Sequence, residues 1–348
     1  MSAAKSGAQT PRFALLNVGF RKRRVKMKHL VRAVLTTLMS IAALALACGA
    51  NAAEKVRLGK AVPFAWTFTP IEVGIEIGNF SKRGLELEVT GFAGDARLQQ
   101  GLASKSIDFG LGSGPGMGFL AKGVAAKAVA AMAGAPMNMS IVVPYESPIN
   151  TIDDLKGKKV GITTVGSLTD WLLKRVVADR KWAPNDVSAV TVGGLDSTRA
   201  ALKTGQIDAV VIALELGYAQ EAAKQWRVLA PLAPFAPHFH THVIYARDEL
   251  IAARPAVVES FLRAWFETIA FMRANKPRTV EITSKVLHLD EAVISRVYDE
   301  QIKIFTSDGS FDPQALAVLR QSLVEMGILQ QVPDDSVMFT TRFLPVKF

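Results

Sequence analysis

Two loops rich in glycine and hydroxyl side chains are the first candidates for chemistry in this sequence. They span residues 112–117 (GSGPGM) and 163–169 (TTVGSLT), and their candidate contacts are Ser113, Gly114, Gly166, Ser167 and Thr169. Glycine lets the backbone approach a ligand closely, and free N–H groups at a helix start favour an anion. Serine and threonine in such loops also commonly cap the helix that follows, and capping uses the same N–H groups. Both loops therefore predict contact with an anionic solute.

Three further side chains could meet the same solute. Phe64 and Trp66 follow the first predicted strand, where an aromatic ring can cover the organic part of a small molecule. Glu215 follows the predicted strand 209–212, where its carboxylate could bind an amine or an imidazole of the solute. The alternatives remain open: Trp66 could be core packing, and Glu215 could be an acid favoured by a helix dipole.

Three histidines, His238, His240 and His242, alternate along one segment. Alternate residues of a strand share a face, as metal ligands do. No nearby Cys, Asp or Glu completes a metal site, so the sequence predicts no metal and no cofactor. A solute contact from His240 or His238 is the stronger hypothesis.

Motifs for catalysis are missing from the sequence. It contains no G-x-S-x-G, no H-E-x-x-H and no P-loop, and the glycines at 112–118 lack the spacing of a dinucleotide fingerprint. The sequence therefore predicts a binding protein rather than an enzyme.

The elements that position these residues follow an α/β pattern. Short β-branched runs alternate with amphipathic helical patterns, which predicts largely parallel sheets. The clearest predicted strands are 55–59, 85–89, 107–111, 140–144, 159–162, 187–192 and 209–212. The clearest predicted helices are 70–79, 170–180, 255–274, 290–304 and 313–327.

An internal echo indicates two similar lobes. Residues 102–108 carry the pattern L-x-S-x-x-I-D, and residues 202–208 repeat it as L-x-T-x-x-I-D. Each copy ends a predicted helix and enters a short strand, after a glycine-rich turn with an Asp. The spacing is too long for a solenoid repeat, so it favours one such unit in each of two lobes.

The charge of the chain is concentrated at its start. The 348 residues carry a formal net charge of +10, with 49% hydrophobic and 21% charged residues. Nine of the 41 Lys and Arg residues precede Glu54 and no acid does, which leaves 32 basic and 31 acidic residues in the remainder. The nearly neutral remainder gives no reason to expect a nucleic-acid partner.

The start of the chain has the organisation of a secretory signal peptide. A basic stretch is followed by the apolar run 34–47 and by Ala50-Asn51-Ala52, which predicts cleavage before Ala53. Residues 1–53 are therefore expected to be an extension plus signal peptide, and Met27 would begin one of ordinary length. The single cysteine, Cys48, lies in a weak match to a lipoprotein box, so lipid attachment there is the alternative to cleavage. Cleavage would leave a mature chain without cysteine.

Four segments resemble the periplasmic solute-binding proteins of ABC importers. They are residues 77–85 (IGNFSKRGL), 101–108 (GLASKSID), 152–161 (IDDLKGKKVG) and 204–209 (TGQIDA). They resemble in particular the nitrate/sulfonate/taurine-type group, which also includes binders of thiamine-pyrimidine precursors. The resemblance implies a two-lobed periplasmic-binding-protein-like (type II) fold with the ligand in the cleft between the lobes. By this analogy, lobe one is 54–143 plus 241–348, and lobe two is 144–240.

The expected function is solute capture for import. The resemblance implies a monomeric periplasmic protein that binds a small organic anion and delivers it to a membrane permease with its ATPase. The two glycine-rich loops favour an anion, and the expected solute is a sulfonate such as taurine, or a carboxylate, before nitrate. Arg97 or Arg199 could contribute to its binding. The alternatives are a sensor that serves a signalling partner, and a heterocycle binder or enzyme relative of the thiamine-pyrimidine type.

Overall fold

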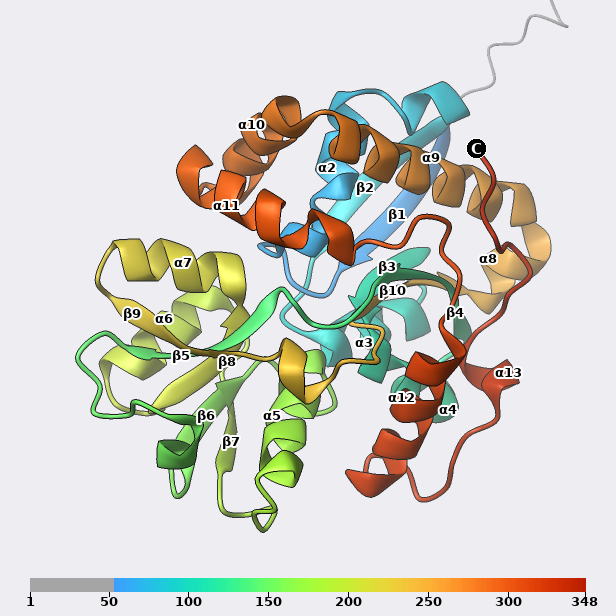
Figure 1. Cartoon of the computed structure of the whole chain (residues 1–348). Coiled ribbons are helices and arrows are strands. Elements are labelled where there is room, and N and C mark those ends of the chain that lie inside the picture. Colours follow the sequence, from blue (N-terminus) through green and yellow to red (C-terminus); the bar gives the residue numbers. More distant parts are fainter. Residues whose placement is uncertain (1–52) are drawn as a thin grey trace, which may run out of the picture. The chain divides into compact units, whose positions relative to one another are not determined.

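Two five-stranded sheets, each with helices packed against it, form the part of the chain that the structure describes (Figure 1). This structure is a computed structural model, and it describes residues 53–348. The predicted signal peptide, the start at Met27 and lipid attachment at Cys48 lie outside these residues. The predicted α/β class is confirmed.

The first sheet, in lobe one, has the strand order β2-β1-β3-β10-β4. Its strands are β1 (Glu54–Lys60), β2 (Leu85–Gly91), β3 (Phe109–Ser113), β4 (Ala126–Ala133) and β10 (His242–Arg247). β1 pairs in parallel with β2 and β3, whereas β10 is antiparallel to β3 and β4. The sheet is therefore mixed rather than largely parallel, because β10 enters it on the return from lobe two.

The helices of lobe one come from both ends of the described chain. The earlier ones are α2 (Pro70–Glu76), α3 (Asp95–Ala103) and α4 (Met117–Ala121). The later ones are α8 (Asp248–Ala253), α9 (Pro255–Ala274), α10 (Lys276–Leu287), α11 (Glu291–Gln301), α12 (Pro313–Glu325) and α13 (Asp335–Met338). The 20-residue α9 begins at a proline, which suits the first position of a helix, and buries the apolar stripe that its sequence predicts.

The second sheet, in lobe two, has the equivalent order β7-β6-β8-β5-β9. Its strands are β5 (Met139–Pro144), β6 (Lys159–Ile162), β7 (Ser188–Thr191), β8 (Ala209–Ala213) and β9 (Trp226–Pro231). Its helices are α5 (Leu168–Asp179), α6 (Leu195–Lys203) and α7 (Leu214–Ala222). Here β6 is parallel to β7 and β8, and β5 is antiparallel to β8 and β9.

The sequence echo corresponds to one repeated connection. Asp108 leads into β3, and its carboxylate accepts the backbone N–H of Arg57 on β1 at 3.0 Å. Asp208 leads into β8, and its carboxylate accepts the backbone N–H of Lys159 on β6 at 2.8 Å. Each Asp also donates its own N–H back to the carbonyl of the same partner. The helix–strand unit predicted in each lobe is therefore present in both.

Two chain crossings join the lobes and run beside each other. The first lies between β4 and β5, and the second between β9 and β10. At the lobe-two end, Leu232 donates its N–H to the carbonyl of Met139, and at the lobe-one end Thr241 donates to that of Ala133. The sequence-based boundary at 143/144 assigned β5 to lobe one, whereas β5 pairs within the second sheet. The expected boundary at 240/241 falls within the second crossing.

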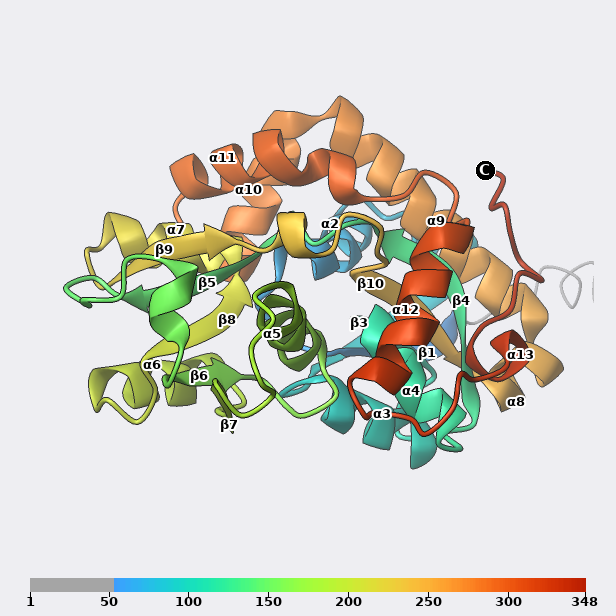
Figure 2. The same cartoon turned by 60° about the horizontal axis from the view of Figure 1, so that its bottom comes forward.

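Contacts between the lobes also come from the later helices. The hydroxyl of Tyr218 on α7 donates to Glu300 on α11 at 2.7 Å, and the Arg296 guanidinium lies 3.5 Å from the centre of the Tyr218 ring. The indole N–H of Trp171 on α5 donates to the hydroxyl of Ser322 on α12 at 2.7 Å. Figure 2 shows α5 on the side of lobe two that faces α12. Among the described helices, none combines the length and the apolar character that crossing a membrane requires.

Candidate functional site

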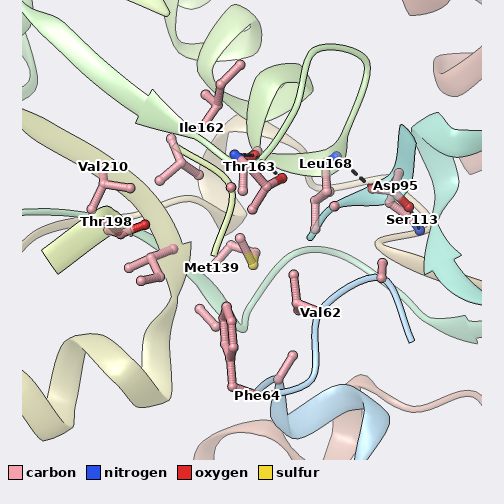
Figure 3. Close-up of a pocket in the computed structure, with 18 of the residues that line it drawn as sticks. Val62, Phe64, Asp95, Ser113, Met139, Ile162, Thr163, Leu168, Thr198 and Val210 are labelled. Atoms are coloured by element: carbon pink, nitrogen blue, oxygen red, sulfur yellow. Dashed lines mark hydrogen bonds between the residues drawn. The ribbon is translucent and has the colours of Figure 1, made fainter. Parts of the chain in front are cut away.

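A cavity of about 60 Å³ lies where the two sheets face each other (Figure 3). Lobe one supplies the loop after β1, the start of α3, the end of β3 and the start of β10, and lobe two supplies the ends of β6 and β8. Ligands of open α/β sheets bind at such strand ends. Since one water molecule needs about 10–15 Å³ of such space, the cavity suits a small solute.

Most of the cavity wall is apolar. Its apolar side chains include Val62, Phe64, Phe68, Met139, Ile162, Leu168 and Val210. Its polar and charged side chains are Asp95, Ser113, Asn138, Thr163, Thr169, Thr198 and His242. Among the described residues no lysine or arginine lines it. A binding site with an apolar wall and a few polar groups is typical of small-molecule recognition.

The hydroxyl groups of the wall bond to one another or to the backbone. Thr163 Oγ1, Ser167 Oγ and Thr169 Oγ1 lie 2.9 Å from each other, and the N–H of Thr163 donates to Thr169 Oγ1 at 2.8 Å. Thr198 donates its hydroxyl to the carbonyl of Gly194 at 2.9 Å. These groups fix the shape of the wall within lobe two.

Asp95 joins the two lobes at the edge of the cavity. Its Oδ1 accepts the N–H of Ser113 at 2.8 Å and its Oδ2 accepts the hydroxyl of Ser113 at 2.9 Å, both in lobe one. Its Oδ2 also accepts the N–H of Leu168, the first residue of α5 in lobe two, at 3.4 Å. Burial raises the pKa of the Asp95 carboxyl above its usual value, and the hydrogen bonds from Ser113 and Leu168, which favour the carboxylate, offset part of this rise.

Asn138 and His242 have polar atoms that the wall itself does not satisfy. Asn138 lies on the first crossing with 0% exposure, and neither its Oδ1 nor its Nδ2 has a hydrogen-bond partner among residues 53–348. His242 begins β10, its ring packs 4.8 Å from that of Phe68, and its Nδ1 has no partner in the same range. Burial lowers the pKa of His242 to about 3, so its imidazole is neutral near pH 7.

The residues predicted from the sequence fall into two groups. Phe64, Ser113 and Thr169 line the cavity. Trp66, Gly114, Gly166, Ser167, Glu215 and His240 lie outside its lining. The exposed side chains of Arg97 and Arg199 do not reach it either.

Trp66 and Glu215 are hydrogen-bonded to each other outside the cavity lining. Trp66 is fully buried, with its ring 6.2 Å from that of Tyr298 and 6.1 Å from that of Phe305. Its backbone N–H donates to Glu215 Oε1 at 2.6 Å. Burial raises the pKa of Glu215 to about 7.

The two loop glycines predicted to contact the solute, Gly114 and Gly166, are instead required by the course of the backbone. A Cβ on Gly114 would lie 2.1 Å from the carbonyl oxygen of His240, so only glycine allows the second crossing to pass so close. Gly166 adopts φ +78°, a conformation that glycine accommodates readily, and its N–H donates to Asp170 at 2.8 Å. Ser167 lies immediately before α5, and its hydroxyl lies within hydrogen-bond distance of the hydroxyls of Thr163 and Thr169.

The three histidines do not form one site. His238 is exposed, whereas His240 is buried, and its Nε2 accepts the N–H of Asp312 at 2.9 Å. Burial lowers the pKa of His240 to about 4, which keeps it neutral as an acceptor. Within residues 53–348 no group of three or more His, Cys, Asp or Glu side chains is arranged to hold a metal ion.

Sequence reasoning missed Asp95, Asn138 and His242 as wall residues. The sequence did contain a signal for Asp95: it follows Gly94 in one of the two glycine-rich turns that precede the repeated pattern. An acidic residue at such a position favours the start of a helix, which is where Asp95 lies. The sequence contained no signal for Asn138, because its place in the cavity wall depends on the path of the first chain crossing between the lobes. The sequence signal at His242 was its place among three alternating histidines, a pattern that indicates metal ligands rather than a cavity wall.

Comparisons with known proteins find relatives in sequence and solved structures of similar fold. A provisionally named binding protein of Brucella abortus (strain 2308) is 29% identical over 302 residues, which are 84% of this chain and 92% of that protein. The alkanesulfonate-binding protein SsuA from Xanthomonas axonopodis pv. citri, bound to MOPS, superimposes with a TM-score of 0.71 at 18% identity over 81% of this chain and 95% of that one. The desulfurization enzyme DSZB superimposes with a TM-score of 0.61 at 15% identity, over 84% of this chain and 97% of that enzyme.

The structural likenesses show the fold, which is that of the periplasmic binding proteins, as the resemblance implied. The sequence comparison adds the family, described as NMT1/THI5 like, which matches residues 66–279. That match covers more than half of the chain, so the chain belongs to the NMT1/THI5-like family.

Proposed function

We propose that this chain is the solute-binding component of an ABC importer. It captures a small solute between its lobes in the periplasm and delivers it, as a monomer, to a membrane permease with its ATPase. The observation that carries this proposal is the cavity between the two sheets, whose wall comes from both lobes. The binding proteins among the relatives support it.

The mechanism is a shift between open and closed states. The two crossings are the hinge, and the contacts of Asp95 and Trp171 with the opposite lobe belong to the closed state. A solute that touches both walls binds the closed state more tightly, and it shifts the population only by that difference. Closure then presents a surface made by both lobes to the permease.

The solute has two candidate chemistries. The first is a small organic anion, which the glycine-rich loops predict; a sulfonate or a carboxylate is expected before nitrate, and the alkanesulfonate-binding neighbour supports a sulfonate. The cavity wall supports an uncharged solute, because no described lysine or arginine lines it and Asn138 offers both a donor and an acceptor. Either kind of solute is expected to carry an apolar part, because aliphatic and aromatic side chains make up most of the cavity wall.

Binding without chemical conversion is part of this proposal. The fold alone does not decide the point, since both a binding protein and a desulfurization enzyme share it. In the described wall the single carboxylate, Asp95, is held by Ser113 and Leu168, and the one cysteine of the sequence is Cys48. A solute recovered unchanged after incubation supports binding, and a converted one contradicts it.

Thermal unfolding against a panel of solutes tests the proposed function. The panel contains alkanesulfonates, carboxylates, nitrate, pyrimidines and small amides. A solute that binds only the folded chain adds about 2.7 kcal/mol of stability at a hundred times its dissociation constant, and so raises Tm. Uptake of that solute by cells that carry or lack the gene separates import from sensing. Uptake that does not depend on the gene would contradict the import role.

A further inference from the structure

The carboxylate of Asp95 occupies the place that the sequence assigns to an anionic solute. The two glycine-rich loops were expected to present free N–H groups to an anion. In the structure, Ser113 of the first loop and Leu168 of the second both donate their N–H groups to Asp95 (Figure 3). The side chain has 3% exposure and lines the cavity.

Three further N–H groups of these loops, those of Gly114, Gly116 and Gly166, also have acceptors within the chain. Gly114 donates its N–H to the carbonyl of Thr241 at 3.2 Å, and Gly116 donates to Ser113 Oγ at 3.2 Å. In the second loop, Gly166 donates to Asp170, whose carboxylate pairs with Lys174 at 3.0 Å. A solute anion would have to displace these internal acceptors to reach the same donors.

No described cation compensates for the charge of Asp95 inside the cavity. Lys60, the last residue of β1, directs its ammonium to Glu72 at 2.6 Å and to the carbonyl of Pro63 at 3.3 Å, and it does not line the cavity. A solute anion would therefore meet a carboxylate at close range in a buried site, where like charges repel strongly.

Two polar side chains remain for recognition, and both are uncharged. The amide of Asn138 offers an acceptor and two donor hydrogens, and the neutral imidazole of His242 offers one donor and one acceptor. Both side chains line the cavity, and their unpartnered atoms are buried. Leaving such atoms unpaired is costly, so a solute that pairs with them gains affinity.

We infer that Asp95 is a specificity-determining residue that excludes anions, and that the solute is an uncharged molecule hydrogen-bonded by Asn138 and His242. This inference rests on the proposed function and narrows its solute to one of the two candidate chemistries. Asp95 acts on specificity in two ways: its charge repels an anion, and its hydrogen bonds occupy one loop N–H group in each lobe, those of Ser113 and Leu168.

Matched pairs of small probes test the role of charge. Methanesulfonate and dimethyl sulfone have similar shapes, as do acetate and acetamide, but only the first of each pair is an anion. Ligand-observed NMR titration detects such weak binders with the wild-type chain, with Asp95→Asn and with the control Asp170→Asn. Asp170 is also buried and accepts a loop N–H, but it does not line the cavity.

The wild-type chain is expected to bind dimethyl sulfone and acetamide in preference to the two anions. In Asp95→Asn the dissociation constant for methanesulfonate should fall by roughly tenfold or more, because a like charge at close range is removed. Asp170→Asn should keep the preference of the wild type. Asn138→Leu should weaken acetamide binding without creating anion binding.

Anion binding by the wild-type chain equal to or tighter than binding of the uncharged partner would overturn the inference, as would Asp95→Asn without any gain for the anions. Circular dichroism checks that each variant folds, and Asp95→Ser replaces Asp95→Asn if the latter does not. Such a preference of the wild-type chain for an anion contradicts only this inference, whereas a chain that binds none of the panel or probe solutes contradicts the proposed function itself.

Discussion

Glu215 of lobe two accepts the backbone N–H of Trp66 of lobe one at 2.6 Å, and both residues are fully buried. Glu215 lies in the first turn of α7, and Trp66 begins the short 3-10 helix 66–68 after β1. The bond therefore ties the start of one lobe's helix to the loop that forms the cavity wall in the other lobe. It makes the stability of the closed state depend on the charge of one carboxyl.

Glu215 should make the folded chain less stable as the pH rises through its titration range. Its pKa is about 7 in the folded chain against a usual value of 4.5, because burial disfavours the ionised form. Between these two values the folded chain binds more protons than the unfolded chain, so the free energy of unfolding falls with rising pH. The total loss is on the order of 3 kcal/mol, complete above about pH 7.

Urea unfolding of the wild type and of Glu215→Gln, at steps from pH 4.5 to 8, measures this effect. Glutamine keeps an acceptor for the N–H of Trp66 but does not titrate, so the difference in stability between the two proteins should change across this window. A constant difference over the whole range would contradict a raised pKa for Glu215.

The bond between Trp171 and Ser322 should contribute to holding the lobes together. The indole N–H of Trp171 donates to Ser322 Oγ at 2.7 Å, and both residues are buried. Ser322→Ala leaves that N–H buried without an acceptor, which costs about 1–3 kcal/mol of unfolding free energy. Urea unfolding of Ser322→Ala, Trp171→Phe and the double variant completes a mutant cycle, in which the double variant should lose less than the sum of the two. Strict additivity would show that the two side chains are not coupled.

Gly114 should be irreplaceable where the second crossing passes over it. An alanine Cβ there would meet the carbonyl oxygen of His240 at 2.1 Å, and backbone on both sides leaves little room to relax. Gly114→Ala should therefore lose about 1–3 kcal/mol or more by overpacking. Gly194→Ala is the matched control, because a Cβ at Gly194 would have no atom of another described segment within 4 Å. Equal melting temperatures for the two variants would refute the close approach.

Local patterns in the sequence predict much of the fold. The helix at Pro255–Ala274 and the strand at Lys159–Ile162 have the bounds that apolar spacing predicts. The strand β4 was missed because its sequence, AKAVAAMA, is mostly alanine, a weak strand former. It is a strand because it is buried in the sheet beside β10, a partner more than 100 residues away in the sequence.

The site was harder to predict than the fold, for a physical reason. Phe64, Ser113 and Thr169 could be found because each lies at the carboxyl end of a strand or in the segment that follows one, and these strand ends meet in the cavity. Asn138 lies on a crossing whose position depends on both sheets. The partners of the loop amides could not be foreseen either, because Asp95 reaches Leu168 across 73 residues of sequence.

The central claim is that the cavity between the lobes binds the solute, and filling the cavity tests it most directly. Val62 lines the cavity and is only partly buried, so Val62→Trp should occupy the space without disrupting the core. Val165→Trp is the control, since Val165 is 67% exposed and lies outside the cavity lining. Calorimetric titration with a solute that raises the Tm of the wild type should show binding abolished in Val62→Trp and unchanged in Val165→Trp. Binding by a folded Val62→Trp with wild-type affinity would contradict the account.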